Sequence, residues 1–410
     1  MKSMTGSALI AASVAWLAVF AAPAAQAQIS DGVIKIGVLS DMSGLYAGIG
    51  GPGSVVAAKM AVEDYGAAKK GMKVEIVSAD HLNKPDVGSN IARTWYDVDK
   101  VDMIIDVPNS GVALATSQVA SSKNKVFIVS GAAASDITGP KCNANTIHWT
   151  YDTWMLANGT GTAIVKTGGD SWFFLTSDYA FGHALERDTM AAVEKAGGKV
   201  LGKVRHPINT NDFSSFLLQA QSSKAKVIGL ANAGGDTINS IKQAAEFGIV
   251  KGGQSLAGLL VFASDVAALG LPTAQGLILT ETWYWDMNDA NRAWTKRWQQ
   301  ERQGKWPTMI HAGVYAGITH YLKAAVALKG NLSDGKAVVA QMKSMPTEDQ
   351  LFGKGTIRPD GRKIHPAYLL EVKKPSDSKH PGDFYNVRAT IPADQAFRPL
   401  KEGNCPLVSG

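Results

Sequence analysis

Apolar and polar positions alternate along the first third of the chain in a pattern typical of strands followed by helices. Short runs rich in Val and Ile predict buried strands at 33–39, 74–77, 103–107 and 126–129. Within 54–65 the apolar residues Val55, Ala58, Val62 and Tyr65 share one helical face, and further helices are predicted at 87–98 and 113–122. Buried apolar strands that alternate with helices are typical of a parallel α/β sheet.

Nearly the same rhythm restarts after a break at 150–153. Strands are predicted at 172–175, 199–204, 227–230 and 259–262, and helices begin near residues 182, 213, 237 and 265. Long amphipathic helices follow at 289–303 and 311–328, and the final segment, rich in Pro, Lys and Asp, predicts hairpins and a tail. The sequence therefore predicts two similar doubly wound α/β lobes in tandem, with a ligand cleft between them.

The composition agrees with a large folded protein. The chain has 410 residues, of which 45% are hydrophobic and 19% charged, which suits two or three domains and excludes a disordered chain. The formal charge of +6 arises from scattered Lys and Arg without a basic run. That distribution favours a solvated basic surface, so we expect no nucleic-acid partner.

The first residues predict export. Lys2 precedes an apolar stretch, 8–22, and the small-x-small site Ala25-Gln26-Ala27, which together describe a secretory signal peptide over 1–27. The apolar stretch is shorter than the roughly 20 residues that a membrane-spanning helix needs. We expect an exported, periplasmic protein cleaved near Ala27.

Two cysteines, Cys142 and Cys405, remain for an oxidising compartment. An even, minimal count predicts one disulfide, which would close a loop of about 260 residues and attach the C-terminal tail to the first lobe. Two cysteines alone do not make a metal site, and the eight histidines lack metal-ligand spacing, so we expect no metal.

Catalytic motifs are not found. The sequence has no H-E-x-x-H, no Walker A loop and no G-x-S-x-G elbow. The glycines at 48–53 match G-x-G-x-x-G, but they stand well beyond their strand and lack the acid about 20 residues further on that dinucleotide binding requires. We expect a Gly-rich loop over a cleft, no cofactor and no enzymatic activity.

The informative positions follow the strands, because ligands of open α/β sheets bind beyond the carboxyl ends of the strands. Small residues and hydroxyls at helix N-termini leave backbone N–H groups free for an anion such as a carboxylate, although ordinary helix capping explains any single one. The loops in question are 41–46, 108–111, 130–135, 177–182, 232–236 and 263–265.

These loops carry a family resemblance. Ser-Gly-x-Tyr at 43–46, Val-Pro-Asn-Ser-Gly at 107–111, Val-Ser-Gly-Ala-Ala-Ala-Ser-Asp at 129–136 and Thr-Ser-Asp-Tyr-Ala-Phe-Gly at 176–182 resemble, in this order, the periplasmic substrate-binding proteins of ABC transporters. The closest group is the leucine/isoleucine/valine-binding family. The resemblance implies a type I fold with lobe 1 at 28–150 plus 283–352, lobe 2 at 151–282 plus 353–395, and a three-crossover hinge. It also implies that the tail 396–410 returns to lobe 1.

The resemblance further implies a site. Its carboxylate-binding loops match Asn109 and Ser110 and the turn Ala132, Ala133 and Ala134, with Ser135 next to it, where amino-acid binders usually supply a Thr hydroxyl. The aromatic cover matches Tyr46 from one lobe and Tyr179 or Phe181 from the other. Amino-acid binders place an acid where this chain has Ala263 and Ser264, so the ammonium partner is missing unless Asp265 or Asp236 supplies it.

Aromatic residues are frequent near the predicted cleft and crossovers, among them Tyr151 and Trp283, while Asp152 stands at the first crossover as a hinge residue, a ligand contact or an exposed turn acid. Asn232 completes the candidate set. The interpretation is a monomeric receptor that binds a small carboxylate, best an aromatic acid such as a hydroxybenzoate or phenylpropenoate, and delivers it to an ABC permease and ATPase. An amino-acid receptor, a sensory module for a kinase or chemoreceptor, and an exported enzyme stay as alternatives.

Overall fold

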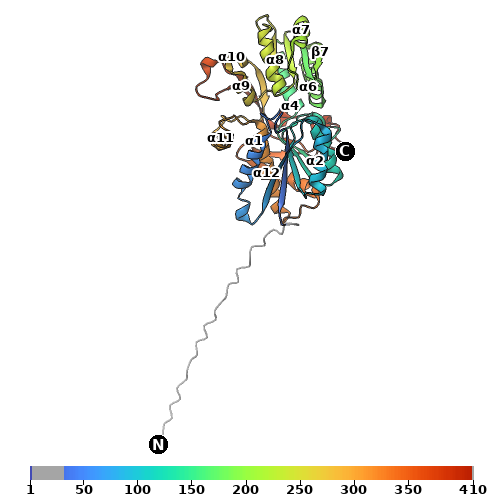
Figure 1. Ribbon diagram of the computed structural model, residues 1–410, viewed down its shortest axis with the longest axis vertical. Coiled ribbons are helices and arrows are strands. Elements are labelled where there is room, and N and C mark those ends of the chain that lie inside the picture. The colour runs from blue at the N-terminus through green and yellow to red at the C-terminus, as the bar shows by residue number, and fades with distance from the viewer. Residues whose placement is uncertain (2–31, 409–410) are drawn as a thin grey trace.

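The computed structural model describes Met1 and residues 32–408, so the predicted signal peptide lies almost entirely outside the described residues. The described chain forms two lobes, one built on the sheet that contains β1 and one on the sheet that contains β6 (Figure 1). The expected fold class, two doubly wound α/β lobes, is confirmed.

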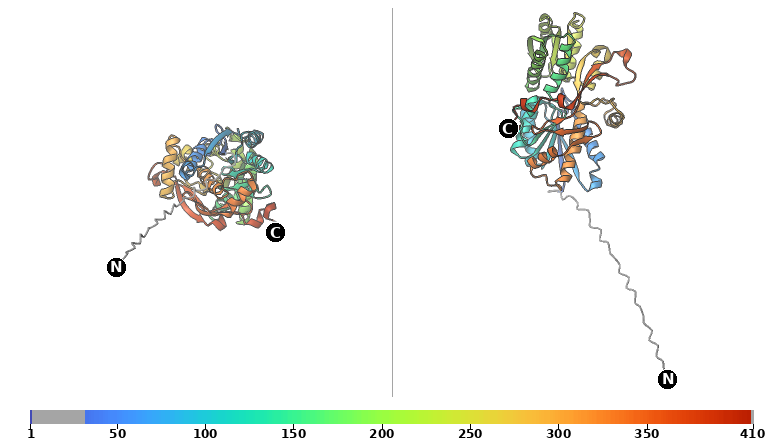
Figure 2. Two further views of the ribbon diagram at one scale, coloured as in Figure 1. Left: turned by 90° about the horizontal axis from the view of Figure 1, so that it is seen from below. Right: turned by 180° about the vertical axis from the view of Figure 1, so that it is seen from behind.

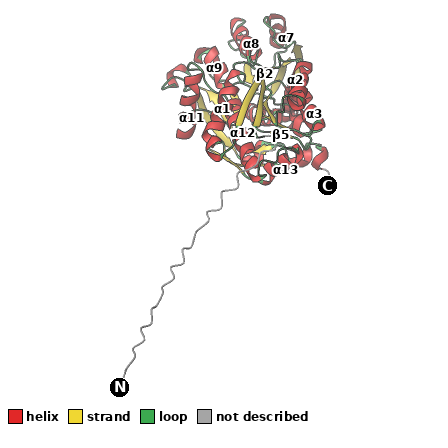
Figure 3. Cartoon of the chain, turned by 60° about the horizontal axis from the view of Figure 1, so that its bottom comes forward, coloured by secondary structure: helices red, strands yellow, loops and turns green. Residues whose placement is uncertain are grey.

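Lobe 1 is built on a parallel five-stranded sheet in the order β2-β1-β3-β4-β5. Its strands β3 and β4 are buried along their whole length, as expected for apolar strands covered on both faces. Helices cover both sides of the sheet (Figure 3). The elements are β1 Ile34–Ser40, α1 Pro52–Tyr65, β2 Val74–Asp80, α2 Pro85–Asp97, β3 Met103–Asp106, α3 Ser110–Ser122, β4 Val126–Val129, β5 Thr146–His148, α11 Asp289–Glu301, α12 Met309–Ala327 and α13 Gly335–Ser344.

Lobe 2 is built on a parallel four-stranded sheet in the order β7-β6-β8-β9, next to an antiparallel sheet β10-β14-β15. Its elements before β10 are α4 Thr153–Leu156, α5 Thr162–Lys166, β6 Ser171–Ser177, α6 Ala180–Lys195, β7 Lys199–His206, α7 Ser214–Ser222, β8 Val227–Ala231, α8 Gly235–Glu246, β9 Ser255–Gly258, α9 Ala263–Leu269 and α10 Leu271–Ala274. The antiparallel strands are β10 Ile278–Glu281, β14 Ala367–Val372 and β15 Tyr385–Ile391.

The C-terminal segments connect the lobes and return to lobe 1. A small antiparallel sheet contains β11 Thr347–Asp349, β12 Gly353–Ile357 and β13 Lys363–Ile364, and the short helix α14 spans Ala393–Ala396. Because β12 pairs with β11 and packs on α13, we propose that the third crossover lies at 365–366 rather than at residue 353. The C-terminal end lies beside lobe 1 (Figure 2), where Cys405 forms the predicted disulfide with Cys142.

Two predicted strands are wrong. The apolar run Leu259–Phe262 is not a strand; β9 ends at Gly258, opposite Leu230, and the four apolar residues form the buried connection to α9. The alternating aromatic run Trp283–Trp285, which also predicts a strand, is likewise no strand, because β10 ends at Glu281 and the three aromatic residues lie in the second crossover. In both cases the apolar residues are buried, but their backbones do not pair with a neighbouring strand.

Candidate functional site

Two loops at the carboxyl ends of β3 and β4 meet in lobe 1. Ser110 is the first residue of α3, and its Oγ accepts hydrogen bonds from the backbone N–H groups of Ala133 (3.3 Å) and Ala134 (3.2 Å). Ser110 and Ala132 to Ala134 are all buried. The structure therefore brings together the two loops that the resemblance assigned to a carboxylate, and we name Ser110, Ala133 and Ala134 the clamp.

Asn109 serves α3 rather than the clamp. Its side-chain oxygen accepts from the N–H groups of Gly111 (2.9 Å) and Val112 (3.1 Å), which caps the helix and fixes the position of Ser110. The preceding Val107 has a φ of 54°, which is costly for a β-branched residue. The strained turn at Val107 therefore precedes the N-terminus of α3, where Ser110 contributes its hydroxyl to the clamp.

Asp106, the last residue of β3, was missed by the sequence analysis. Its carboxylate accepts from Ser40 Oγ (2.8 Å) and Ser130 Oγ (3.3 Å), and burial raises its pKa to about 6. A usable signal existed, because Asp106 is an acid that directly follows the apolar strand residues 103–105.

Two tyrosines from opposite lobes meet above these loops. The hydroxyl oxygens of Tyr46 and Tyr179 are 2.5 Å apart, and the Phe181 ring lies 5.9 Å from the Tyr179 ring. Tyr46 and Phe181 are buried, and burial raises the pKa of both tyrosines. The predicted aromatic cover is thus assembled from both lobes, in a closed arrangement.

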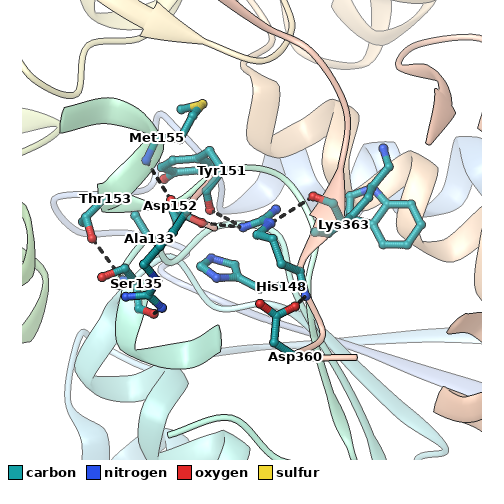
Figure 4. Close-up of polar contacts among 12 residues, drawn as sticks. Ala133, Ser135, His148, Tyr151, Asp152, Thr153, Met155, Asp360 and Lys363 are labelled. Atoms are coloured by element: carbon teal, nitrogen blue, oxygen red, sulfur yellow. Dashed lines mark hydrogen bonds and ion pairs between the residues drawn. The ribbon is translucent and has the colours of Figure 1, made fainter. Parts of the chain in front are cut away.

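Tyr151 and Asp152 lie in the first crossover and contact the third. Tyr151 donates its hydroxyl proton to the carbonyl of Gly131 (2.6 Å), beside the clamp. The fully buried Arg362 donates to the Tyr151 carbonyl (2.9 Å) and lies 3.5 Å from the Asp152 carboxylate, which also caps α4 through Met155 N–H (Figure 4). Asp152 is therefore buried in the first crossover, and the exposed-turn alternative is wrong.

Ser135 belongs to an interlobe polar cluster instead of the clamp. Its hydroxyl donates to Asp188 Oδ2 (2.7 Å) and accepts from Arg187 Nη2 (2.8 Å), both on α6 of lobe 2. Thr153 also donates to Asp188 (2.6 Å), and Arg187 pairs with Asp136 (3.1 Å). Sequence reasoning missed Arg187 and Asp188, because a helical surface pair carries no pattern that identifies its partners across a cleft.

The remaining lobe 2 candidates are mostly occupied by structural contacts. The Asn232 side chain bonds Thr237 (2.7 Å) and His206 (3.3 Å). Asp236 accepts from the N–H groups of Asn209 and Thr210, and burial raises its pKa to about 6. These two residues therefore hold the loop after β8 in place.

Three further candidates lie around α9 and the second crossover. Asp265 caps α9 through the Phe262 N–H (3.0 Å), and burial raises its pKa to about 7. The Oγ of Ser264, next to Asp265, and the indole N–H of Trp283 are both buried. Neither has a hydrogen-bond partner among the described residues. The Trp283 ring packs edge-on against Trp294 at 5.7 Å.

Comparison with known proteins decides the family. Residues 33–379 match the family model described as periplasmic binding protein. The chain belongs to this family. A periplasmic binding protein of Burkholderia mallei has a TM-score of 0.89 and 51% identity over 92% of this chain and all of that one. A branched-chain amino acid ABC transporter periplasmic ligand-binding protein of Burkholderia xenovorans gives 0.80 and 39%, over 91% and 99%.

The fold extends to more distant binding proteins. A solute-binding protein of an ABC transporter from Rhodopseudomonas palustris, solved with benzoate, has a TM-score of 0.79 and 22% identity over 88% of this chain and 97% of that one. The present binding protein is a periplasmic solute-binding protein of the branched-chain and amino-acid group, which binds small molecules and docks to an ABC transporter. Within the described residues, no helix is both long and apolar enough to cross a membrane.

Proposed function

We propose that this binding protein is the receptor of an ABC importer for a small aromatic carboxylate, such as a hydroxybenzoate or a phenylpropenoate. The observation that carries the proposal is the buried clamp at the N-terminus of α3. There the Ser110 hydroxyl and two backbone N–H groups converge, with the helix dipole behind them. Backbone donors and the positive end of a helix dipole suit an anion.

The surroundings of the clamp favour an aromatic ring. Tyr46, Tyr179 and Phe181 lie above it, and aromatic side chains prefer to pack on other rings. Burial raises the pKa of Asp265 to about 7, so below that pH its carboxyl is mostly protonated and can donate a hydrogen bond to a ring hydroxyl. The benzoate complex of the Rhodopseudomonas protein supports the proposal to the extent that this fold accommodates such an acid there.

Closure couples binding to delivery. The contacts between Tyr46 and Tyr179 and between Ser135 and Asp188 join the two lobes. A ligand that touches both lobes stabilises the closed form by the difference between its affinities for the closed and the open form. The closed form is then the shape that the transporter recognises.

A second candidate, an amino-acid receptor, is favoured by one specific observation. Asp265 and Glu281 are both buried, and burial together with the charge of Asp265 holds the pKa of Glu281 well above its usual range. Neither carboxyl forms an ion pair with a cation in the described part of the chain. A ligand ammonium would supply that missing charge.

A titration panel tests both candidates. Benzoate, 4-hydroxybenzoate, cinnamate and leucine would be titrated into wild type, Ser110→Ala and Asp265→Asn by calorimetry. We expect aromatic acids to bind wild type, to bind Ser110→Ala about 5- to 150-fold more weakly (about 1–3 kcal/mol), and to tolerate Asp265→Asn. Binding of leucine that Asp265→Asn abolishes would replace the proposal by the amino-acid candidate.

A matched control uses the same helix. Ser117 is buried on α3 and its hydroxyl bonds Thr146 at 2.8 Å, away from the clamp. Ser117→Ala should lower thermal stability and leave the affinity for aromatic acids unchanged. Equal affinities of Ser110→Ala and wild type would show that the clamp does not bind the carboxylate.

A further inference from the structure

A cavity lies between the lobes, away from the clamp. Its walls are Ser264 and Ala267 of α9 on one side and Trp298, Arg302, Lys305 and Trp306 on the other, and its floor is the Gly-rich loop 47–53. The volume is about 240 Å³, and none of the clamp residues lines it. We name it the Trp298 cavity. Figure 1 shows α9 of lobe 2 on the same side of the molecule as α11 of lobe 1.

Two polar atoms in the lining of the Trp298 cavity lack hydrogen-bond partners among the described residues. Arg302 Nε and Ser264 Oγ are buried and form no hydrogen bond with any described residue. Neither Arg302 nor Lys305 forms an ion pair within residues 32–408. Burial alone accounts for the lowered pKa of the Arg302 guanidinium. A buried polar donor without an acceptor is costly, so the arrangement calls for an anion.

The aromatic walls are held in place before any ligand arrives. The Trp298 indole donates to the Gly53 carbonyl (3.0 Å) and packs at 4.7 Å on His311. The Trp306 ring packs at 4.7 Å on Trp285. Fixed indole faces favour a planar ring, and a guanidinium with an adjacent ammonium favours a carboxylate.

We propose that the Trp298 cavity is a second binding site, which takes a planar aromatic monocarboxylate with its carboxylate on Arg302 and Lys305 and its ring between the indoles. Because the cavity is lined by α9 of lobe 2 and by Trp298 and the segment after α11 of lobe 1, occupancy favours the closed form. The second site would thus bind cooperatively with the clamp, since both prefer the same conformation.

The experiment follows 4-fluorobenzoate by ¹⁹F NMR and calorimetry. Wild type should show two saturable sites. Arg302→Gln with Lys305→Gln should weaken one site about tenfold or more, while Ser110→Ala should weaken the other. Ala267→Phe, which fills the cavity from the exposed face of α9 and removes no charge, should abolish the same site as the Arg302 and Lys305 change.

The outcomes separate the two proposals. Loss of the Arg302-dependent site with an intact clamp site supports the Trp298 cavity, and it does so even if the clamp proves to bind another class of solute. Absence from wild type of any site that depends on Arg302, or a second site that survives both Arg302→Gln and Ala267→Phe, overturns it. Benzamide, which is planar but neutral, should not occupy the cavity, and equal binding of benzamide and 4-fluorobenzoate would also contradict the role of Arg302.

Discussion

Replacing Arg362 by Met tests how the hinge is held together. The guanidinium is fully buried, donates to the Tyr151 carbonyl (2.9 Å) and the Lys363 carbonyl (3.0 Å), and lies 3.5 Å from the Asp152 carboxylate. Removing it leaves a buried acid without its cation, a change that costs about 3–5 kcal/mol. We expect the free energy of unfolding of Arg362→Met to fall by about that amount.

The pH dependence gives the variant a signature that a simple packing loss lacks. Burial already raises the pKa of Asp152, and Arg362 opposes that shift. Without Arg362 the pKa in the folded state rises further, so the native state of the variant binds a proton that the unfolded chain releases above about pH 4. Stability of the variant should therefore fall as the pH rises, and its deficit relative to wild type should be larger at pH 8 than at pH 5.

Urea unfolding of a double-mutant cycle at both pH values is the assay. Arg362→Met, Asp152→Asn and the double variant should show a coupling of about 1.5–3 kcal/mol at pH 8, which shrinks at pH 5. Asp152→Asn keeps the side-chain oxygen that caps α4, so all four proteins of the cycle retain this cap. Additive effects of the two substitutions, or a deficit independent of pH, would refute the ion pair as the source of hinge stability.

Three further predictions follow from other contacts. Cys142→Ser removes the disulfide to Cys405 and should lower the free energy of unfolding by about 2–5 kcal/mol relative to oxidised wild type. Urea unfolding measures this loss, and reduced wild type should show a similar one. Asp265→Asn removes a group whose folded pKa of about 7 exceeds its unfolded value near 4. The wild type loses stability from this group as the pH rises between those values. The melting temperature of the variant, relative to that of wild type, should therefore rise from pH 5 to pH 8, and a difference that does not change with pH would contradict this. Gly234→Ala places a Cβ 2.8 Å from the Leu45 carbonyl of the other lobe, at a φ of 57°. It should weaken solute affinity by hindering closure, visible as a larger radius of gyration with solute present, and an unchanged radius would show that closure tolerates the methyl group.

The sequence predicted what depends on neighbours along the chain. The predicted strand at 126–129 coincides with β4, and the end of each parallel strand placed Ser110 and Ala134 at one sheet edge. Tyr46 and Tyr179 were expected as covers from opposite lobes, and they meet there. The position of a strand and the residues of the loop that follows it are local properties of the sequence, which explains why the predicted strand and the meeting of these loops agree with the structure.

Pairings between distant segments could not be predicted. Asp152 and Arg362 are separated by 210 positions, and either residue alone has the pattern of a surface charge. Ser135 was placed beside the clamp because it follows Ala134, yet its hydroxyl contacts Asp188. Adjacent side chains can point in different directions, so the position of Ser135 next to Ala134 did not decide which residues its hydroxyl contacts.

Each lobe is built from segments that are far apart in the sequence, and this has a consequence for folding during synthesis. α12 lies against the lobe 1 sheet, where Gly317 approaches Ile105 and Ile128, although these segments are far apart in the sequence. β14 likewise joins β10 of lobe 2 only after α12 has been made. A chain that emerges from its N-terminus therefore carries uncovered apolar sheets until its last strands arrive, and neither lobe can complete its core first. Folding is delayed by the order of the segments themselves, which leaves time for an unfolded chain to be threaded through a membrane before it becomes compact.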